Sequence, residues 1–72
     1  MIKVQYSYWT GDDTEVIEFK TNTTPKTMKK ILRGYDRDYD SGDYDGALED
    51  YILELGYKFI PYIDNFDVCH EA

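Results

Sequence analysis

The 72-residue chain has little of several residue types that would assign it to a specialised class of protein. Cys69 is the only cysteine, so no disulfide can form within the chain, and this favours a reducing compartment. No charged-then-apolar leader and no long apolar run occurs, so we expect a cytoplasmic protein without a membrane-bound segment. The length predicts a single domain, residues 1–72, with one modest core and no large internal active-site cavity.

Basic residues are also scarce, with eight lysines and arginines against fifteen acidic residues and a net charge of −7. This balance argues against direct binding of nucleic acid or an anionic membrane by the molecule as a whole. Hydrophobic residues make up 42% of the chain and aromatic residues 17%, which is too much for a disordered protein. We therefore expect a folded domain.

Signatures of catalysis are missing. The sequence has no glycine-rich phosphate loop and no nucleophile elbow, and its one histidine, His70, adjoins Cys69. A Cys-His pair supplies half of the ligands that zinc needs, and carboxylates without a pocket to desolvate one of them do not separate acid from base. We therefore expect that the protein is not an enzyme and that it has no catalytic residue, no metal site and no cofactor.

What the chain does contain predicts an α+β domain. Residues 2–9 alternate apolar and polar side chains, residues 15–20 resume the alternation, and Gly11 with its aspartate neighbours suits a hairpin turn between them. The segment 57–63 resembles a third strand. Pro61 would place this strand at a sheet edge or introduce a bulge, and a short fourth strand could run through Phe66 and Val68.

Two helices are predicted between these strands. Thr24 and Pro25 form a helix start, and the first helix should fray at Gly34 and end near Tyr35. A second helix fits residues 45–55, with Gly56 as its terminator. The expected order is β-β-α-α-β, a small antiparallel sheet with both helices on one face.

The most unusual segment, residues 34–56, carries eight acids and one base, so its charge of −7 equals that of the whole chain. In the run DRDYDSGDYDGALEDYILEL, which begins at Asp36, aspartates alternate with tyrosines and continue into the second helix. A solvated loop and helix face is the ordinary interpretation. Against it, Asp50 and Glu54 are like charges four residues apart, which destabilise a helix by roughly 0.2–0.5 kcal/mol.

Calcium binding is an alternative. Asp36, Asp38 and Asp40, placed between two helices, match the first, third and fifth ligand positions of an EF-hand loop. The match then fails, because the required glycine comes one residue late, at Gly42, and Ala47 stands where the bidentate glutamate belongs.

Mimicry of nucleic acid is the third interpretation. In an extended chain, residues two apart are about 6.6 Å apart, which resembles the step between neighbouring phosphates. Tyrosines between the acids would add flat contact area that packs against arginine. The candidate partner-binding residues are Asp36, Asp38, Tyr39, Asp40, Asp43, Tyr44, Asp45, Glu49, Asp50, Leu53 and Glu54.

In length, acidity and this run, the chain resembles the small inhibitors that phages and mobile elements use against CRISPR or restriction nucleases, several of which are DNA mimics. The resemblance implies a non-catalytic inhibitor that binds the basic, nucleic-acid-binding groove of a nucleic-acid-processing enzyme in the host cytoplasm. No functional residue is transferred from that class, which shares no sequence signature. The protein would act as a monomer or homodimer.

A basic cluster gives a further alternative. The first helix carries Lys26, Lys29, Lys30 and Arg33 opposite its apolar stripe. A solvated helix face explains these residues, but a small nucleic-acid-binding module that uses the same face is also compatible with them. The chain is in either case a charge dipole.

Overall fold

The computed structural model describes all residues 1–72 as a four-stranded sheet with two helices, which confirms the expected α+β class and element order. β1 (Ile2–Trp9) and β2 (Thr14–Thr21) form an antiparallel hairpin in which Tyr6 lies opposite Ile17. The turn is closed by the Thr10 amide, which donates to the Asp13 carbonyl over 2.9 Å.

The sheet has the order β3-β2-β1-β4. β3 (Ile60–Pro61) is an edge strand, as Pro61 predicts, but it is only two residues long. Residues 57–59 lie outside it. The amides of Tyr57 and Lys58 bond elsewhere, to the Ile52 carbonyl over 3.2 Å and to Oδ1 of Asn22 over 2.7 Å. β4 (Val68–Glu71) pairs parallel with β1, so the sheet is mixed rather than wholly antiparallel.

The first helix, α1 (Pro25–Ser41), is six residues longer than expected. It begins as predicted, with Oγ1 of Thr24 accepting a hydrogen bond from the Thr27 amide over 3.2 Å. It does not end near Tyr35. Its terminator is Gly42, whose φ of 82° is the left-handed conformation that favours glycine and whose amide donates to the Tyr39 carbonyl.

Gly34 lies inside α1, where a side chain would crowd the neighbouring helix. A Cβ at this position would be 3.2 Å from the hydroxyl oxygen of Tyr51. Gly34 is therefore explained by close packing against the next helix rather than by a helix end. That helix, α2 (Leu48–Glu54), is shorter than the expected 45–55.

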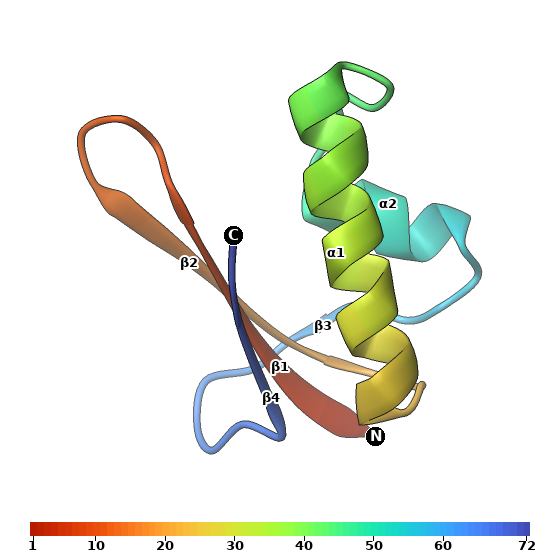
Figure 1. The fold of residues 1–72 in the computed structure, drawn as a ribbon. Coiled ribbons are helices and arrows are strands. Elements are labelled where there is room, and N and C mark those ends of the chain that lie inside the picture. The colour runs from red at the N-terminus through yellow and green to blue at the C-terminus, as the bar shows by residue number, and fades with distance from the viewer.

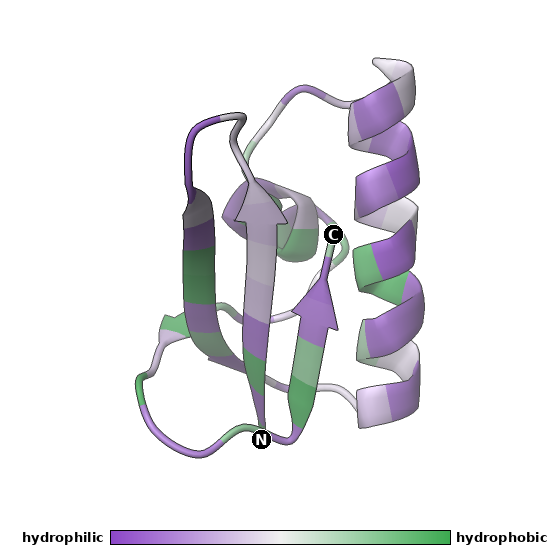
Figure 2. Ribbon diagram, turned by 60° about the vertical axis from the view of Figure 1, so that its left-hand side comes forward, coloured by the Kyte–Doolittle hydropathy of each residue, from purple (hydrophilic) through white to green (hydrophobic).

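The core lies between the two helices and one face of the sheet. In Figure 2, α2 lies behind the strands and α1 runs beside β4. The buried apolar side chains come from β1, β2, β4 and both helices: Val4, Tyr6, Phe19, Met28, Leu32, Tyr35, Leu48, Ile52 and Val68. In Figure 1 the hairpin and α1 diverge, so the hairpin turn and the last turn of α1 stand apart. No helix is long and apolar enough to cross a bilayer.

Candidate functional site: an acidic surface and an aromatic cleft

The first half of the Asp/Tyr segment is helical. Residues 36–41 form the last turns of α1, so the extended row of carboxylates expected for these positions is wrong. Along a helix, residues two apart point to nearly opposite sides. Asp36 and Asp40 accordingly share one side of α1, and Asp38 points away from them toward α2.

The calcium-loop alternative fails for the same reason. An EF-hand needs its ligands on a loop between two helices, whereas Asp36, Asp38 and Asp40 belong to a continuous helix. No group of three or more His, Cys, Asp or Glu side chains is arranged to hold a metal ion. The segment is therefore not a calcium-binding loop of that type.

Asp36 joins α1 to the sheet. Its carboxylate accepts a hydrogen bond from the hydroxyl of Tyr6 on β1, and its Oδ2 lies 2.7 Å from Nε2 of His70 on β4. The His70 ring stacks on the Tyr6 ring at 5.5 Å. Burial and then the bond to Asp36 raise the pKa of Tyr6 far above its ordinary range. Asp36 is thus a half-buried structural acid, not a free contact residue.

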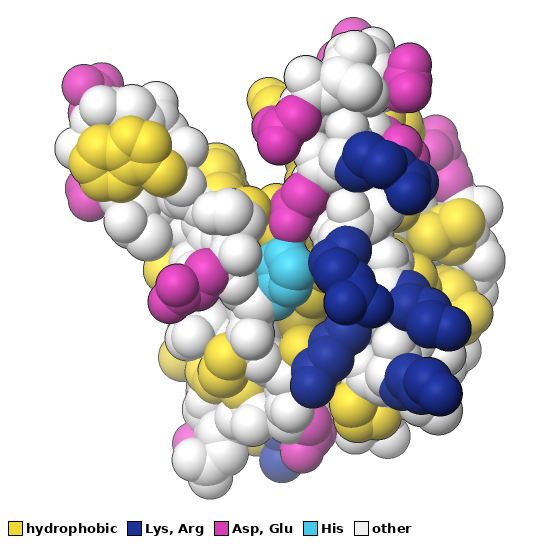
Figure 3. All heavy atoms as spheres, viewed as in Figure 1, with side chains coloured by type: hydrophobic (Ala, Val, Ile, Leu, Met, Phe, Trp, Pro, Cys, Tyr) yellow, Lys and Arg dark blue, Asp and Glu magenta, His cyan; other side chains and the backbone are white.

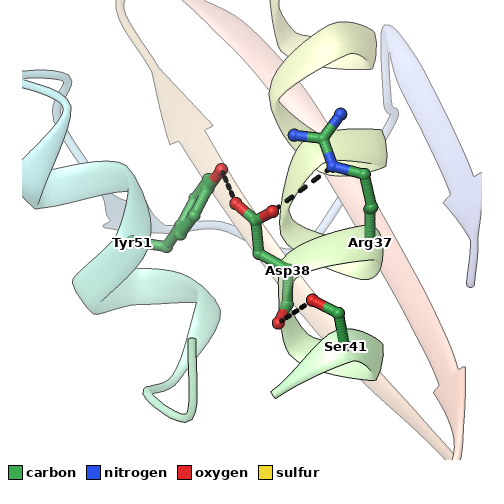
Figure 4. A network of polar contacts seen from close by, with 4 residues as sticks. All are labelled: Arg37, Asp38, Ser41 and Tyr51. Carbon is green, nitrogen blue, oxygen red and sulfur yellow. Dashed lines mark hydrogen bonds and ion pairs between the residues drawn. The ribbon is translucent and has the colours of Figure 1, made fainter. Parts of the chain in front are cut away.

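Asp38 joins the two helices (Figure 4). Its Oδ2 accepts a hydrogen bond from the Tyr51 hydroxyl over 3.2 Å, and its Oδ1 pairs with Nε of Arg37 at 3.3 Å. Its backbone carbonyl accepts a bond from the Ser41 hydroxyl. Desolvation, followed by the hydrogen bond to Asp38, raises the pKa of Tyr51. Asp38 is also structural.

The tyrosines of this region pack against one another. The ring centroids of Tyr44 and Tyr51 lie 6.0 Å and 5.3 Å, respectively, from that of Tyr35, which is itself in the core. The Tyr35 hydroxyl donates to the Gly46 carbonyl over 3.0 Å and so holds residues 42–47 against α1. Tyr44 is half-buried rather than free, whereas Tyr39 is 54% exposed and touches Tyr35 with its ring 5.7 Å away.

The remaining acids of the segment face solvent without a cationic partner. The molecule contains two ion pairs, Arg37–Asp38 and His70–Asp36, and neither involves these side chains. We call them the acidic surface: Asp40, Asp43, Asp45, Glu49, Asp50 and Glu54. Three of them, Asp45, Asp50 and Glu54, line a shallow hollow with Tyr44 and Leu53, whose side chain is half-exposed.

A deeper cleft of about 700 Å³ opens between the hairpin and the C-terminal half of α1. Figure 3 shows this region as a notch between the hairpin and α1, with the histidine on the surface below it. We call it the aromatic cleft, because its lining contains five aromatic side chains: Tyr6, Tyr8, Trp9, Tyr35 and Tyr39. Three carboxylates, Asp36, Asp40 and Asp45, also line it, and no lysine or arginine does.

The aromatic cleft has no signature in the sequence. Tyr6, Tyr8 and Trp9 belong to β1, about thirty residues before the acidic segment, and their alternation indicates only a half-buried strand. The sequence predicts Tyr39, Asp40 and Asp45 as partner-binding residues, but no spacing rule relates them to β1. A surplus of eight tyrosines was the one available signal.

The opposite charge lies on the other end of α1. Lys26, Lys29, Lys30 and Arg33 are exposed and take part in no ion pair. In Figure 3 the basic side chains gather along one part of α1 and the acidic ones toward its end and the hairpin tip. The charge dipole expected from the sequence is present.

The exposed partner-binding candidates and the cleft adjoin each other through Asp45, which lines both the cleft and the shallow hollow. The region therefore combines unpaired negative charge with partly exposed aromatic rings.

No protein-family model matches the chain, and no curated protein or solved structure has significant similarity to it.

Proposed function

We propose that this protein is a non-catalytic binding protein that presents its acidic surface to a basic, nucleic-acid-binding groove of a partner protein. The observation that carries the proposal is the set of six acids, Asp40 to Glu54, that have no cationic partner within the molecule. Like charges held close together destabilise the folded state, and a cationic partner offsets that cost.

Aromatic and apolar side chains beside the acids support a protein partner. Tyr39 and Leu53 are each about half-exposed and lie among the carboxylates. Specific protein interfaces use aromatic rings such as that of Tyr39 as anchors, with charges around them that guide association. A simple counter-ion would need neither side chain.

The charge geometry supports a class of partner. A surface of carboxylates on a rigid helix and an anchored loop is complementary to grooves that bind phosphates, such as those of CRISPR or restriction nucleases. The carboxylates do not form an evenly spaced row, so the mimicry proposed is of charge and not of phosphate spacing. An inhibitor of this type blocks its target by occupying the groove.

Competition with DNA tests the proposal. Labelled duplex DNA is bound to each member of a panel of CRISPR effector complexes and restriction endonucleases, and the protein is added at several salt concentrations. We expect displacement of DNA from at least one member, with an efficiency that falls as salt rises. No displacement from any member would refute the proposed partner class.

Matched charge variants locate the surface. The triple variant Asp43→Lys, Glu49→Lys and Glu54→Lys reverses three exposed acids of the acidic surface. Its control, Asp12→Lys, Glu15→Lys and Glu71→Lys, makes the same change in net charge at exposed positions elsewhere. The first variant should lose the ability to displace DNA from the partner, and the control should retain most of that ability. Equal losses would show that net charge alone matters.

The basic end of α1 supports a second candidate function. Its four bases are exposed and unpaired, so contact with a phosphate backbone is sterically open to them. A filter-binding assay with DNA and RNA at low salt tests this function. Retention of nucleic acid that is lost on Lys29→Glu and Arg33→Glu would favour it over the acidic surface.

A further inference from the structure

We infer that the aromatic cleft is a binding site for a cationic side chain, specifically an arginine presented by a partner protein. The lining brings five aromatic rings and three carboxylates together without one basic residue. Only one part of the inference rests on the proposed function, namely that the arginine belongs to a partner protein.

The aromatic rings suit a planar cation. Tyr39 on α1 is 54% exposed and Trp9 at the end of β1 is 65% exposed, so their faces are accessible to a ligand. A guanidinium stacks on such faces through cation–π attraction, which is strongest for tryptophan. Tyr6, Tyr8 and Tyr35 are more buried and form the wall beneath.

The carboxylates suit the same cation. Asp36 already accepts a bond from Tyr6 and pairs with His70, so it is occupied. Asp40 and Asp45 line the cleft, are exposed and have no partner. Their oxygens are therefore free to accept hydrogen bonds from a guanidinium, whose fork of donors matches a carboxylate.

The fold holds these groups in place before any ligand arrives. Asp40 lies one turn beyond Asp36 on α1, and α1 is fixed to the sheet through Tyr6 and His70. Asp45 is on a loop that the Tyr35 hydroxyl anchors at the Gly46 carbonyl and that the Tyr44 amide ties to the Asp38 carbonyl. Preorganised groups bind with a smaller loss of conformational entropy.

The size of the cleft favours a side chain together with its flanking backbone. Its volume of about 700 Å³ lies within the roughly 300–1,000 Å³ typical of small-ligand sites. An arginine on an exposed loop would fill the aromatic part and leave room for neighbouring residues over Ala47 and Thr10, which also line the cleft.

Three pentapeptides test the inference: acetyl-Gly-Gly-Arg-Gly-Gly-amide and its counterparts with lysine and with citrulline, the neutral isostere of arginine. Trp9 is the only tryptophan, so its fluorescence reports binding in the cleft directly. Amide chemical shifts in the nitrogen–proton spectrum locate the site. We expect saturable binding of the arginine peptide, weaker binding of the lysine peptide and at least about tenfold weaker binding of citrulline.

Variants assign the contact groups. Asp40→Asn and Tyr39→Leu should each weaken arginine binding about fivefold or more, whereas Asp43→Asn, which removes an exposed acid outside the cleft, should change it less than about twofold. The amide spectrum verifies that each variant is folded, and Tyr39→Leu keeps the test valid if Asp40→Asn is unfolded. Three results with the peptides would overturn the inference: equal affinity for the citrulline peptide, a preference for the lysine peptide, or no saturation up to about 20 mM peptide. Equal effects of Asp40→Asn and Asp43→Asn on arginine binding would also overturn it.

The triple variant Asp43→Lys, Glu49→Lys and Glu54→Lys separates this inference from the proposed function. None of its three positions lines the cleft, so it should lose competition with DNA and still bind the arginine peptide. Peptide binding without DNA competition by the unmodified protein would refute only the proposed function. Competition without peptide binding would refute only the arginine site.

Discussion

His70 on β4 places its Nε2 atom 2.7 Å from Oδ2 of Asp36 on α1, thirty-four residues earlier in the chain. The same carboxylate accepts a hydrogen bond from the hydroxyl of Tyr6 on β1. Three elements therefore meet at one half-buried acid. This connection positions the C-terminal half of α1, and with it the carboxylates of the aromatic cleft.

Removing this acid should destabilise the fold. In Asp36→Ala, the hydroxyl of the buried Tyr6 loses its acceptor, and an unsatisfied buried donor costs about 1–3 kcal/mol. Urea denaturation measures the loss. Asp43→Ala, at an exposed acid without a partner, is the matched control and should stay within about 0.5 kcal/mol of the unmodified protein. Similar effects of both substitutions would contradict the role assigned to Asp36.

Stability should fall in alkaline solution. Burial is the first cause that raises the pKa of Tyr6, Tyr35, Tyr44 and Tyr51 in the folded state above the ordinary value of 10.0. Above about pH 10 the unfolded chain releases protons that the folded protein retains, so the free energy of unfolding decreases as pH rises. Below about pH 10 these tyrosines are protonated in both states, and their contribution is fully present.

Tyr6→Phe tests the alkaline effect most directly, because the upward shift is large for Tyr6. Urea denaturation at several values from about pH 8 to pH 11 should give a shallower loss of stability for Tyr6→Phe than for the unmodified protein. Tyr39→Phe, at an exposed ring, is the control. Parallel curves for Tyr6→Phe and the unmodified protein would contradict the prediction.

Gly34 and Tyr51 should be energetically coupled. Gly34→Ala gains about 1 kcal/mol of helix propensity, but its Cβ would lie 3.2 Å from the Tyr51 hydroxyl oxygen and displace that group from Asp38. Loss of the hydrogen bond costs about 0.5–1.5 kcal/mol, so the net effect should be close to zero.

In a Tyr51→Phe background there is no hydroxyl to displace, and Gly34→Ala should then stabilise the protein by about 1 kcal/mol. A double-mutant cycle measured by urea denaturation gives the coupling. The same effect of Gly34→Ala in both backgrounds would show that Tyr51 does not explain the glycine.

Relieving the acidic surface should stabilise the free protein. The last turn of α2 has no basic residue, and Glu54 follows Asp50 by four positions. Glu54→Lys replaces a repulsive pair with an attractive one and favours the helix dipole, together worth roughly 0.5–1 kcal/mol. Thermal denaturation should show a gain that shrinks at high salt. A loss of stability would mean that Glu54 has a partner in the fold.

Local patterns were sufficient for most elements. Alternation in residues 2–9 predicts β1, the Thr24–Pro25 pair predicts the start of α1, and Pro61 predicts that its strand is at an edge. The predicted end of α1, near Tyr35, is wrong by six residues, because the helix continues to Ser41. Glycine within a helix and glycine at a helix end have the same local signature, and only the proximity of Tyr51 separates them at Gly34.

The sequence by itself determined the α+β class, the charge dipole and the concentration of acids in residues 34–56, because these depend on composition and short-range periodicity. The tertiary structure alone decided which acids are free. Asp36 is bonded to Tyr6 and His70, and Asp38 accepts a hydrogen bond from Tyr51. These partners are distant from the two acids in the chain. It also decided that the free acids Asp40 and Asp45 face the aromatic rings of β1, because a cleft depends on how whole elements pack, and packing is not encoded in any local pattern.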